Sequence, residues 1–222
     1  MRMIILSDLS EVLIKGISGV EEIIALRHGT EMARAYKVRH LETEDGFREL
    51  LRGNMTEDDY WRWFLSDGSL PFDSQEMKDF LSDSMKEVIP NTLNVYRRIA
   101  AYPESLHRPN SIVYGTPEIY IVSDHIEERL EELHLYHPDI FRVVSREFWS
   151  CESGQIKTDE GFFPQLLRVL GITADKAVFI DDNIYNTTAA LLTGITSVYF
   201  KNATQLEASL EEYGFYFVPS VA

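Results

Sequence analysis

Residues 177–186 read AVFIDDNIYN, and this stretch decides the fold. Four apolar residues followed by two carboxylates predict a short buried strand, 177–180, that ends at Asp181 and Asp182. Taken alone, such an acidic pair could equally cap the helix that follows. Its weight comes from two further apolar runs in the chain that end in the same way.

Two other short strands are predicted, and polar residues close both of them. One strand, 3–6, ends at Ser7 and Asp8, and the other, 119–122, ends at Ser123 and Asp124. Helical patterns alternate with these strands, which predicts an α/β protein with a Rossmann-like, doubly wound parallel sheet covered by helices on both faces. Ligands bind outside the carboxyl ends of such strands, so we expect the three polar ends to converge on one rim.

The remaining sequence predicts further core elements and one insert. Helices are expected over about 91–101, after Asp124, over 159–170 and around 188–192, with strands at 141–145 and 197–200. Residues 15–90 look helical throughout, with helix-start signals at Thr56 and at Asp73-x-x-Glu76. We therefore predict a core of residues 1–14 and 91–222, interrupted after its first strand by a small all-helical domain at 15–90. The Pro-rich stretch 103–117 is expected to be irregular.

Composition and charge exclude several classes of protein. The chain has 222 residues, 45% of them hydrophobic, which is enough for one large domain or for a core with an insert. Its net charge of −15 repels nucleic acid and anionic lipid, so neither is an expected partner. Cys151 is the single cysteine, which excludes an internal disulfide and fits a reducing compartment. Because no apolar run approaches membrane-spanning length, we expect a cytoplasmic protein.

Four features occur in a fixed order along the chain. They are the sequence DLSEVL at 8–13, the strand that ends at Ser123, Lys157, and the sequence FIDDNIYN at 179–186. Together they resemble the four motifs of the haloacid dehalogenase superfamily, in the branch with a helical cap between motifs one and two (subfamily I, C1-type cap). The resemblance extends from about residue 3 to residue 200 and is most specific in the fourth motif. It implies a hydrolase that acts on a small phosphorylated metabolite.

The resemblance also assigns a nucleophile and a metal site. Asp8 would attack phosphorus and form an aspartyl-phosphate, which divides one difficult displacement into two easier ones. Mg²⁺ would be held by the Asp8 carboxylate, the Ser10 backbone carbonyl and Asp182. Asp181 would support the water ligands of the metal, and Asn186 would hold the loop that carries both carboxylates.

The phosphate itself would contact residues from the second and third motifs. Ser123 would donate a hydrogen bond to a phosphoryl oxygen, with Asp124 beside it in the substrate site. Lys157 would pair with Asp8 and with the phosphate and so shield their mutual repulsion. These residues complete the set that the resemblance names as catalytic or substrate-binding.

One position departs from the family pattern. Phosphatases of this family usually carry a second Asp two residues after the nucleophile, and here that position is Ser10. A hydroxyl is a poor general acid near neutral pH, and its substitution for Asp costs about 10²- to 10⁴-fold in rate. Three functions therefore stay open: a slow or specialised phosphatase, aided by a residue such as Glu11 or His125; a non-catalytic relative that binds phosphate or a protein; and a dehalogenase, which needs no metal and is disfavoured by the pair at 181–182.

Overall fold

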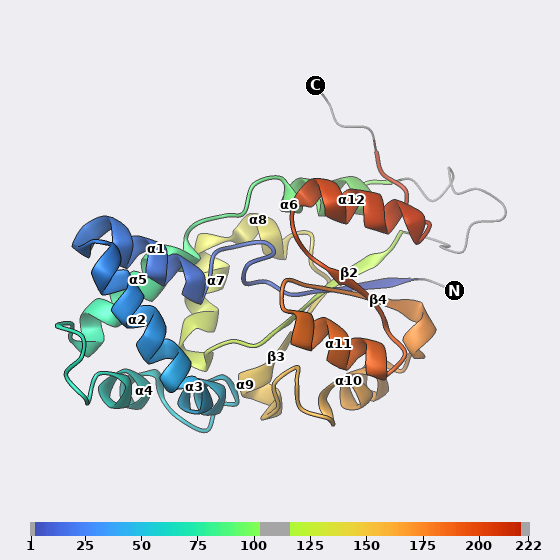
Figure 1. Ribbon diagram of the computed structural model, residues 1–222. Helices are drawn as coiled ribbons and strands as arrows, with labels where there is room; N and C mark the ends of the chain where they lie inside the picture. The colour runs from blue at the N-terminus through green and yellow to red at the C-terminus, as the bar shows by residue number, and fades with distance from the viewer. Residues whose placement is uncertain (1–2, 103–115, 219–222) are drawn as a thin grey trace.

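The computed structural model describes residues 3–102 and 116–218, and its centre is a five-stranded sheet (Figure 1). The strands lie in the order β3-β2-β1-β4-β5, and every pair of neighbours runs parallel. Their bounds are β1 Ile4–Ser7, β2 Glu118–Ser123, β3 Arg146–Trp149, β4 Ala177–Asp181 and β5 Thr196–Tyr199. The predicted α/β class with a parallel sheet is confirmed.

Alternate side chains of each strand point to opposite faces of the sheet, and helices bury both faces. Ile5 packs into one hydrophobic cluster, whereas Ile4 and Leu6 pack into the other. The first cluster takes in α6 (Thr92–Ala100) and α12 (Ala203–Glu212). The second takes in α10 (Phe162–Leu170) and α11 (Ile184–Leu192), and Figure 1 shows these two helices on the side of the sheet away from α6 and α12.

The register of the strands brings their polar ends together. Ser7 of β1 lies opposite Ile121 of β2 on one side and Ile180 of β4 on the other. The residue after Ser7 continues the pairing, because the Asp8 backbone N–H donates to the Ile180 carbonyl at 2.8 Å. The predicted convergence of three strand ends on one rim is therefore confirmed for β1, β2 and β4.

Five helices occupy most of the stretch between β1 and α6. They are α1 Ile17–His28, α2 Thr30–Glu42, α3 Glu44–Leu51, α4 Glu57–Phe64 and α5 Ser74–Met85. Figure 1 shows them gathered to one side of the sheet. Thr56 caps α4 through its side chain, and Asp73 and Glu76 form a full capping box at the start of α5, as the sequence predicts.

The chain leaves the sheet and returns to it at adjacent points. Ile14 pairs with Val88 as an antiparallel bridge. The Lys15 N–H donates to the Glu87 carbonyl at 2.8 Å, and the Ile89 N–H donates to the Leu13 carbonyl at 2.9 Å. Two adjacent crossings fit the predicted boundaries of the insert, 15–90. Its independence as a domain stays a prediction.

Two predictions about secondary structure are corrected, and one helix was missed. The strand expected at 141–145 is wrong, because a short helix, α8 (Pro138–Phe141), begins at Pro138, where the missing N–H costs nothing, and the strand β3 follows it. The helix expected from residue 159 begins at Phe162, which places Pro164 in the first turn, where backbone N–H groups have no intrahelical partner. The helix α12 was not predicted at all.

The remaining helices are short. They are α7 Leu130–Tyr136, α9 Ser150–Ser153 and two single turns at Glu127–Arg129 and Ala174–Lys176. Among residues 3–102 and 116–218, none of the helices combines the length and apolarity that crossing a bilayer requires. Most of the Pro-rich stretch, at 103–115, lies outside the described residues.

Candidate active site

Three carboxylates meet at the carboxyl ends of β1 and β4. One ligand atom of each of Asp8, Asp181 and Asp182 lies within 4.8 Å of the other two. Asp8 and Asp181 are buried and Asp182 is half-buried, so water screens the repulsion among the three only in part. The sequence placed two of these residues on one strand end and the third on its neighbour, and the structure brings them together.

Lys157 supplies the positive charge inside this cluster. Its ammonium nitrogen lies 2.8 Å from Asp8 Oδ2 and 2.6 Å from Asp181 Oδ2, and the side chain is 1% exposed. Burial alone would lower the pKa of Lys157, but the surrounding carboxylates, with Asp181 first among them, outweigh it and raise that pKa. Lys157 therefore stays charged at any physiological pH and bridges the nucleophile candidate to the fourth motif.

Asp181 is held in place by donors on both of its oxygens. The Asn183 backbone N–H donates to Oδ1 at 2.7 Å, and the Asn186 side-chain amide lies 3.1 and 3.2 Å from the two oxygens. Asn183 also caps α11, since its side chain accepts from the Tyr185 N–H at 2.9 Å. The role predicted for Asn186, to hold the acidic loop, agrees with these contacts.

Crowding of negative charge shifts the titration of the carboxyl groups. Burial raises the pKa of Asp182 to about 7, and the Asp8 carboxylate adds to the rise. Burial likewise raises the pKa of Asp181, and Lys157 opposes the effect. Three carboxylates against one ammonium leave a net negative centre of hard oxygen ligands. This donor set fits Mg²⁺, which binds through carboxylates and retained waters.

Ser123 lies at the end of β2 with an unused hydroxyl. The residue is 0% exposed, and its Oγ has no hydrogen-bond partner among the described residues. A buried hydroxyl without a partner is costly, and at this rim the Ser123 hydroxyl is free to donate to a bound ligand. Beside it, Asp124 Oδ1 accepts from the Lys157 backbone N–H at 3.0 Å, and burial raises the pKa of Asp124 to about 6. Asp124 therefore fixes the backbone that carries Lys157.

The turn after Asp8 is wound tightly around one carbonyl. The Leu9 carbonyl accepts from the N–H groups of residues 12, 13 and 14 at 3.4, 2.8 and 3.1 Å. Glu11 adopts a left-handed backbone with φ of 59°, and its carboxylate accepts from the Gly16 N–H at 2.8 Å and the Ser18 hydroxyl at 2.6 Å. Glu11 is thus engaged in holding the turn, which makes it a poor replacement for the missing general acid.

Sequence reasoning missed a second layer of support beneath Asp8. The Ser7 hydroxyl donates to the Asp8 carbonyl at 2.7 Å and lies 2.6 Å from the Tyr96 hydroxyl, which must then be the donor in that pair. Tyr96 is buried on α6, far along the chain. The helical periodicity of 91–101 marks Tyr96 as a core residue, but nothing in the sequence pairs it with Ser7.

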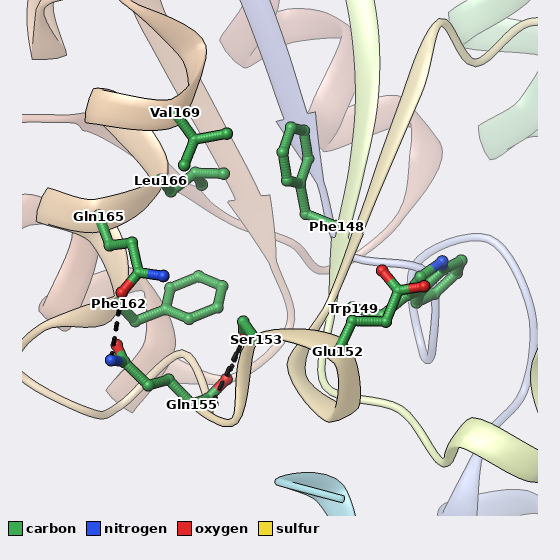
Figure 2. Close-up of a pocket in the computed structure, with 9 residues that line it drawn as sticks. All are labelled: Phe148, Trp149, Glu152, Ser153, Gln155, Phe162, Gln165, Leu166 and Val169. Carbon is green, nitrogen blue, oxygen red and sulfur yellow. Dashed lines mark hydrogen bonds between the residues drawn. The ribbon is translucent and has the colours of Figure 1, made fainter.

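Two cavities lie near the carboxyl ends of the strands. A small cavity of about 40 Å³ lies between the strand ends and the helices α1, α3 and α5. Its polar lining consists of Ser10, Asp124 and His125. A larger cavity of about 190 Å³ lies between β3 and α10, with Phe148 and Phe162 in its walls (Figure 2). The smaller cavity is the candidate active site, because its lining includes Ser10, two residues after Asp8, and Asp124, whose carboxylate accepts from the Lys157 backbone N–H.

The single cysteine takes no part in this site. Cys151 is half-buried, and burial raises the pKa of its thiol to about 11, so it is not a thiolate at neutral pH. The backbone carbonyl of Cys151, in contrast, restricts which residue can occupy position 53. A Cβ at Gly53, whose φ is 74°, would come within 2.7 Å of the Cys151 carbonyl. Only glycine therefore permits this close approach between the turn after α3 and the short helix α9 (Ser150–Ser153).

Known proteins resemble this chain in both sequence and fold, although no family model matches the sequence. The protein named flavin mononucleotide hydrolase 1, chloroplastic, from Arabidopsis thaliana is 25% identical over 166 residues. The match covers 75% of this chain and 61% of the relative, so the chain spans less than two thirds of that protein.

Solved structures resemble the chain over most of its length. A HAD-family enzyme from Bacteroides thetaiotaomicron, in complex with magnesium and inorganic phosphate, gives a TM-score of 0.61 at 14% identity and covers 91% of this chain and 96% of that one. A HAD-like hydrolase from Porphyromonas gingivalis gives 0.64 at 16% identity, with 96% and 97% covered. L-2-haloacid dehalogenase from Xanthobacter autotrophicus, with chloropropionic acid covalently bound, gives 0.62 at 14% identity, with 97% and 85% covered.

These likenesses agree with the strand order and with the motifs that meet at the rim of the sheet. At these sequence identities the solved structures show the fold alone. The chain therefore has the fold of these HAD-family enzymes and of the dehalogenase.

Proposed function

We propose that the protein is a Mg²⁺-dependent phosphatase that acts on a small phosphorylated metabolite through an aspartyl-phosphate at Asp8. The observation that carries the proposal is the juxtaposition of Asp8, Lys157 and the 181–182 pair beside the unused hydroxyl of Ser123. An anionic nucleophile and an anionic substrate need compensating charge at the point of attack. The cluster supplies one ammonium and a donor set for a divalent cation.

Each residue of the site has a defined task in this proposal. The Asp8 Oδ1 accepts from the Leu9 N–H at 2.7 Å, which fixes the rotation of the carboxylate. Oδ2 faces Lys157, whose ammonium reduces the repulsion that an approaching phosphate would meet. Ser123 would donate its free hydroxyl to a phosphoryl oxygen. When bound, Mg²⁺ would be held by the Asp8 carboxylate, the Ser10 carbonyl and Asp182, and would neutralise developing charge as a Lewis acid.

Ser10 sets the expected rate. It lines the small cavity, so it occupies the position from which a general acid would reach the leaving group. A hydroxyl there supplies no proton near neutral pH, which predicts slow turnover unless the leaving group needs little protonation. Aryl phosphates, which have good leaving groups, should therefore be hydrolysed faster than alkyl phosphates.

A dehalogenase is the second candidate, because dehalogenases occur among the structural neighbours. Such an enzyme uses the same aspartate on carbon and needs no metal. Asp182 supports the phosphatase, because a third carboxylate within 4.8 Å of two others adds repulsion that a bound divalent cation would offset. We therefore favour the phosphatase.

The test is release of inorganic phosphate from an aryl phosphate, from flavin mononucleotide and from a panel of sugar and nucleotide monophosphates. The proposal predicts activity with Mg²⁺ that disappears with EDTA and in Asp8→Asn. Activity on haloacids that survives EDTA would replace it with the dehalogenase. Mg²⁺ binding without turnover of any compound would indicate a non-catalytic, phosphate-binding relative.

A further inference from the structure

His125 is a buried side chain of the small cavity that the four motifs do not account for. It is 5% exposed and lines the cavity together with Ser10. The edge of its ring packs against Trp149, with ring centroids 5.8 Å apart and planes at 75°. Burial of a polar ring in a mostly apolar wall is unfavourable unless its nitrogens form hydrogen bonds, either within the protein or to a ligand.

The hydrogen bonds of His125 fix its tautomer. The Ile126 backbone N–H points at His125 Nδ1 at 2.9 Å, and a backbone N–H can only donate. Nδ1 is therefore the acceptor, and the ring proton resides on Nε2. Burial lowers the pKa of His125 to about 4, so the ring is neutral at physiological pH. What His125 offers is a neutral N–H donor rather than a proton to transfer.

The backbone of His125 is fixed as firmly as its ring. Its N–H donates to the Ser150 hydroxyl at 3.0 Å, and that hydroxyl donates in turn to the Leu51 carbonyl at 2.5 Å. Leu51 is the last residue of α3 and itself lines the cavity. The donor is thus positioned relative to both the strand ends and the helices above them. Among the described residues, no hydrogen bond to Nε2 is found.

The rest of the cavity wall is apolar and carries no positive charge. Ile17, Phe47, Leu51, Leu81 and Met85 line it from the helical side. No Lys or Arg within the described ranges is part of its lining. A leaving group with a carboxylate or a second phosphate would therefore find no counter-charge there, and it would face the acidic residues instead. The volume of about 40 Å³ also limits the size that fits without movement of the helices.

We propose that His125 Nε2–H donates a hydrogen bond to an uncharged oxygen on the leaving group and so selects compact, neutral phosphate monoesters that carry such an acceptor close to the ester oxygen. This inference rests on the proposed phosphatase function. The phosphate lies against Asp8, Lys157 and Ser123, and the leaving group lies in the cavity with His125 as its one neutral N–H donor. His125 is a specificity-determining residue in this account, and the missing general acid is not replaced.

Three small phosphate monoesters test the inference. Dihydroxyacetone phosphate carries a carbonyl acceptor beside the ester carbon, propyl phosphate carries none, and phosphoglycolate carries a carboxylate. With Mg²⁺ present, wild-type kcat/KM should be highest for dihydroxyacetone phosphate and lowest for phosphoglycolate. Equal or faster hydrolysis of phosphoglycolate would overturn the charge argument.

Two substitutions separate the donor from the structural role. His125→Asn keeps an oxygen that can accept from Ile126 N–H but has no donor at the Nε2 position, whereas His125→Gln reaches that position with an amide N–H. His125→Asn should lower kcat/KM for dihydroxyacetone phosphate about 3- to 10-fold, the usual value of one neutral hydrogen bond. It should change propyl phosphate hydrolysis less than about 2-fold, and His125→Gln should restore the preference.

Equal losses on both probes in His125→Asn, or no rescue by His125→Gln in a protein of unchanged melting temperature, would overturn the role of His125 while leaving the phosphatase intact. If the wild-type protein hydrolyses sugar monophosphates, which are also alkyl esters, but neither neutral probe, the assignment of the leaving-group site is wrong. If it hydrolyses nothing, including the aryl phosphate, the proposed function itself fails, and this inference fails with it.

Discussion

The rim of the sheet and the helices beside it are stabilised by opposite kinds of contact. At the rim, Lys157 lies between buried carboxylates, and charge is concentrated in a small volume. In the helical stretch, the rings of Tyr36 and Tyr60 pack at a tilt against Phe64, with ring centroids 5.8 and 5.7 Å from it. Ion pairs tie that stretch to segments that flank the sheet, at Arg129 after β2 and at Asp159 before α10. The Arg129–Glu57 pair is 6% and 4% exposed with a 2.6 Å contact, and Arg52 binds Asp159 through two nitrogens.

This contrast separates two tasks. The charged rim is unfavourable for folding but suited to phosphoryl chemistry, because buried opposite charges act strongly on anything that enters. The aromatic stretch contributes stability and shape but no reactive group. Substitutions of the rim carboxylates should therefore change catalysis far more than stability, and substitutions between the two regions should do the reverse. Lys157 serves both tasks, so its substitution should lower both activity and stability.

The largest expected effect is that of Asp8→Asn. Loss of the nucleophile should reduce phosphate release by about 10³-fold or more. The melting temperature should hold or rise, because one of the crowded carboxylates is removed. Steady-state kinetics and thermal unfolding on the same preparation check both statements, and substantial residual activity would show that another residue attacks the substrate.

Lys157→Met tests whether the ammonium serves both tasks. It leaves Asp8 and Asp181 buried without their counter-charge, which costs about 3–5 kcal/mol in the free energy of unfolding. Activity should fall by about 10²- to 10³-fold, the loss typical of a removed electrostatic stabiliser. Urea unfolding with and without Mg²⁺ measures the change in the free energy of unfolding, and steady-state kinetics measure the loss of activity. The cation should restore part of the lost stability, and a protein of wild-type stability would contradict the proposed charge balance.

Ser10→Asp tests the rim by a gain of activity instead of a loss. It places a carboxyl group where the family's phosphatases carry one, and we expect turnover to rise by up to about 10²-fold for alkyl phosphates, within the range for general acid catalysis. The gain should be smaller for aryl phosphates, which need no proton on the leaving oxygen. Turnover numbers on both classes check this, and no gain with Mg²⁺ still bound would mean that Ser10 serves another purpose.

The smallest effect on turnover is expected from Arg129→Met, which breaks the buried pair between the two regions. Removal of one partner of a buried ion pair costs about 3–5 kcal/mol of stability. Turnover at a temperature where the variant is folded should change less than about threefold, because Arg129 touches no residue of the acidic cluster. Urea unfolding supplies the first number and steady-state kinetics the second.

Arg62→Met is the matched control for that variant. Its partner is Asp59, and the pair is 72% and 56% exposed, so its removal should leave the free energy of unfolding almost unchanged, as is usual for surface pairs. Equal destabilisation by the two variants would show that the Arg129 pair does not dominate the contact between the helices and the sheet.

The sequence predicts the rim well because chain direction and strand pairing determine it. Apolar runs that end at Asp8, Ser123 and Asp181 must meet once the strands are parallel, and the structure brings them together. The prediction failed at β3, an edge strand whose polar residues, Arg146 and Glu147, give no apolar run, so Val143 and Val144 drew the prediction to the wrong place.

Contacts between distant segments could not be predicted from the sequence. Nothing in the local pattern pairs Tyr96 with Ser7, or fixes the tautomer of His125 through a backbone N–H. The residues that line the small cavity are also determined by how α1, α3 and α5 pack over the strand ends. Tertiary packing decides such contacts, whereas periodicity reports only which face of an element is buried.

The most direct test of the central claim is to find the phosphoryl group on the protein. The wild-type protein is mixed with an aryl phosphate and Mg²⁺, quenched in acid within milliseconds, and digested for mass spectrometry. The account predicts a phosphorylated peptide that contains Asp8, absent with EDTA and absent in Asp8→Asn. Phosphate release at full rate with no modified Asp8, or with the phosphoryl group on another residue, would contradict it.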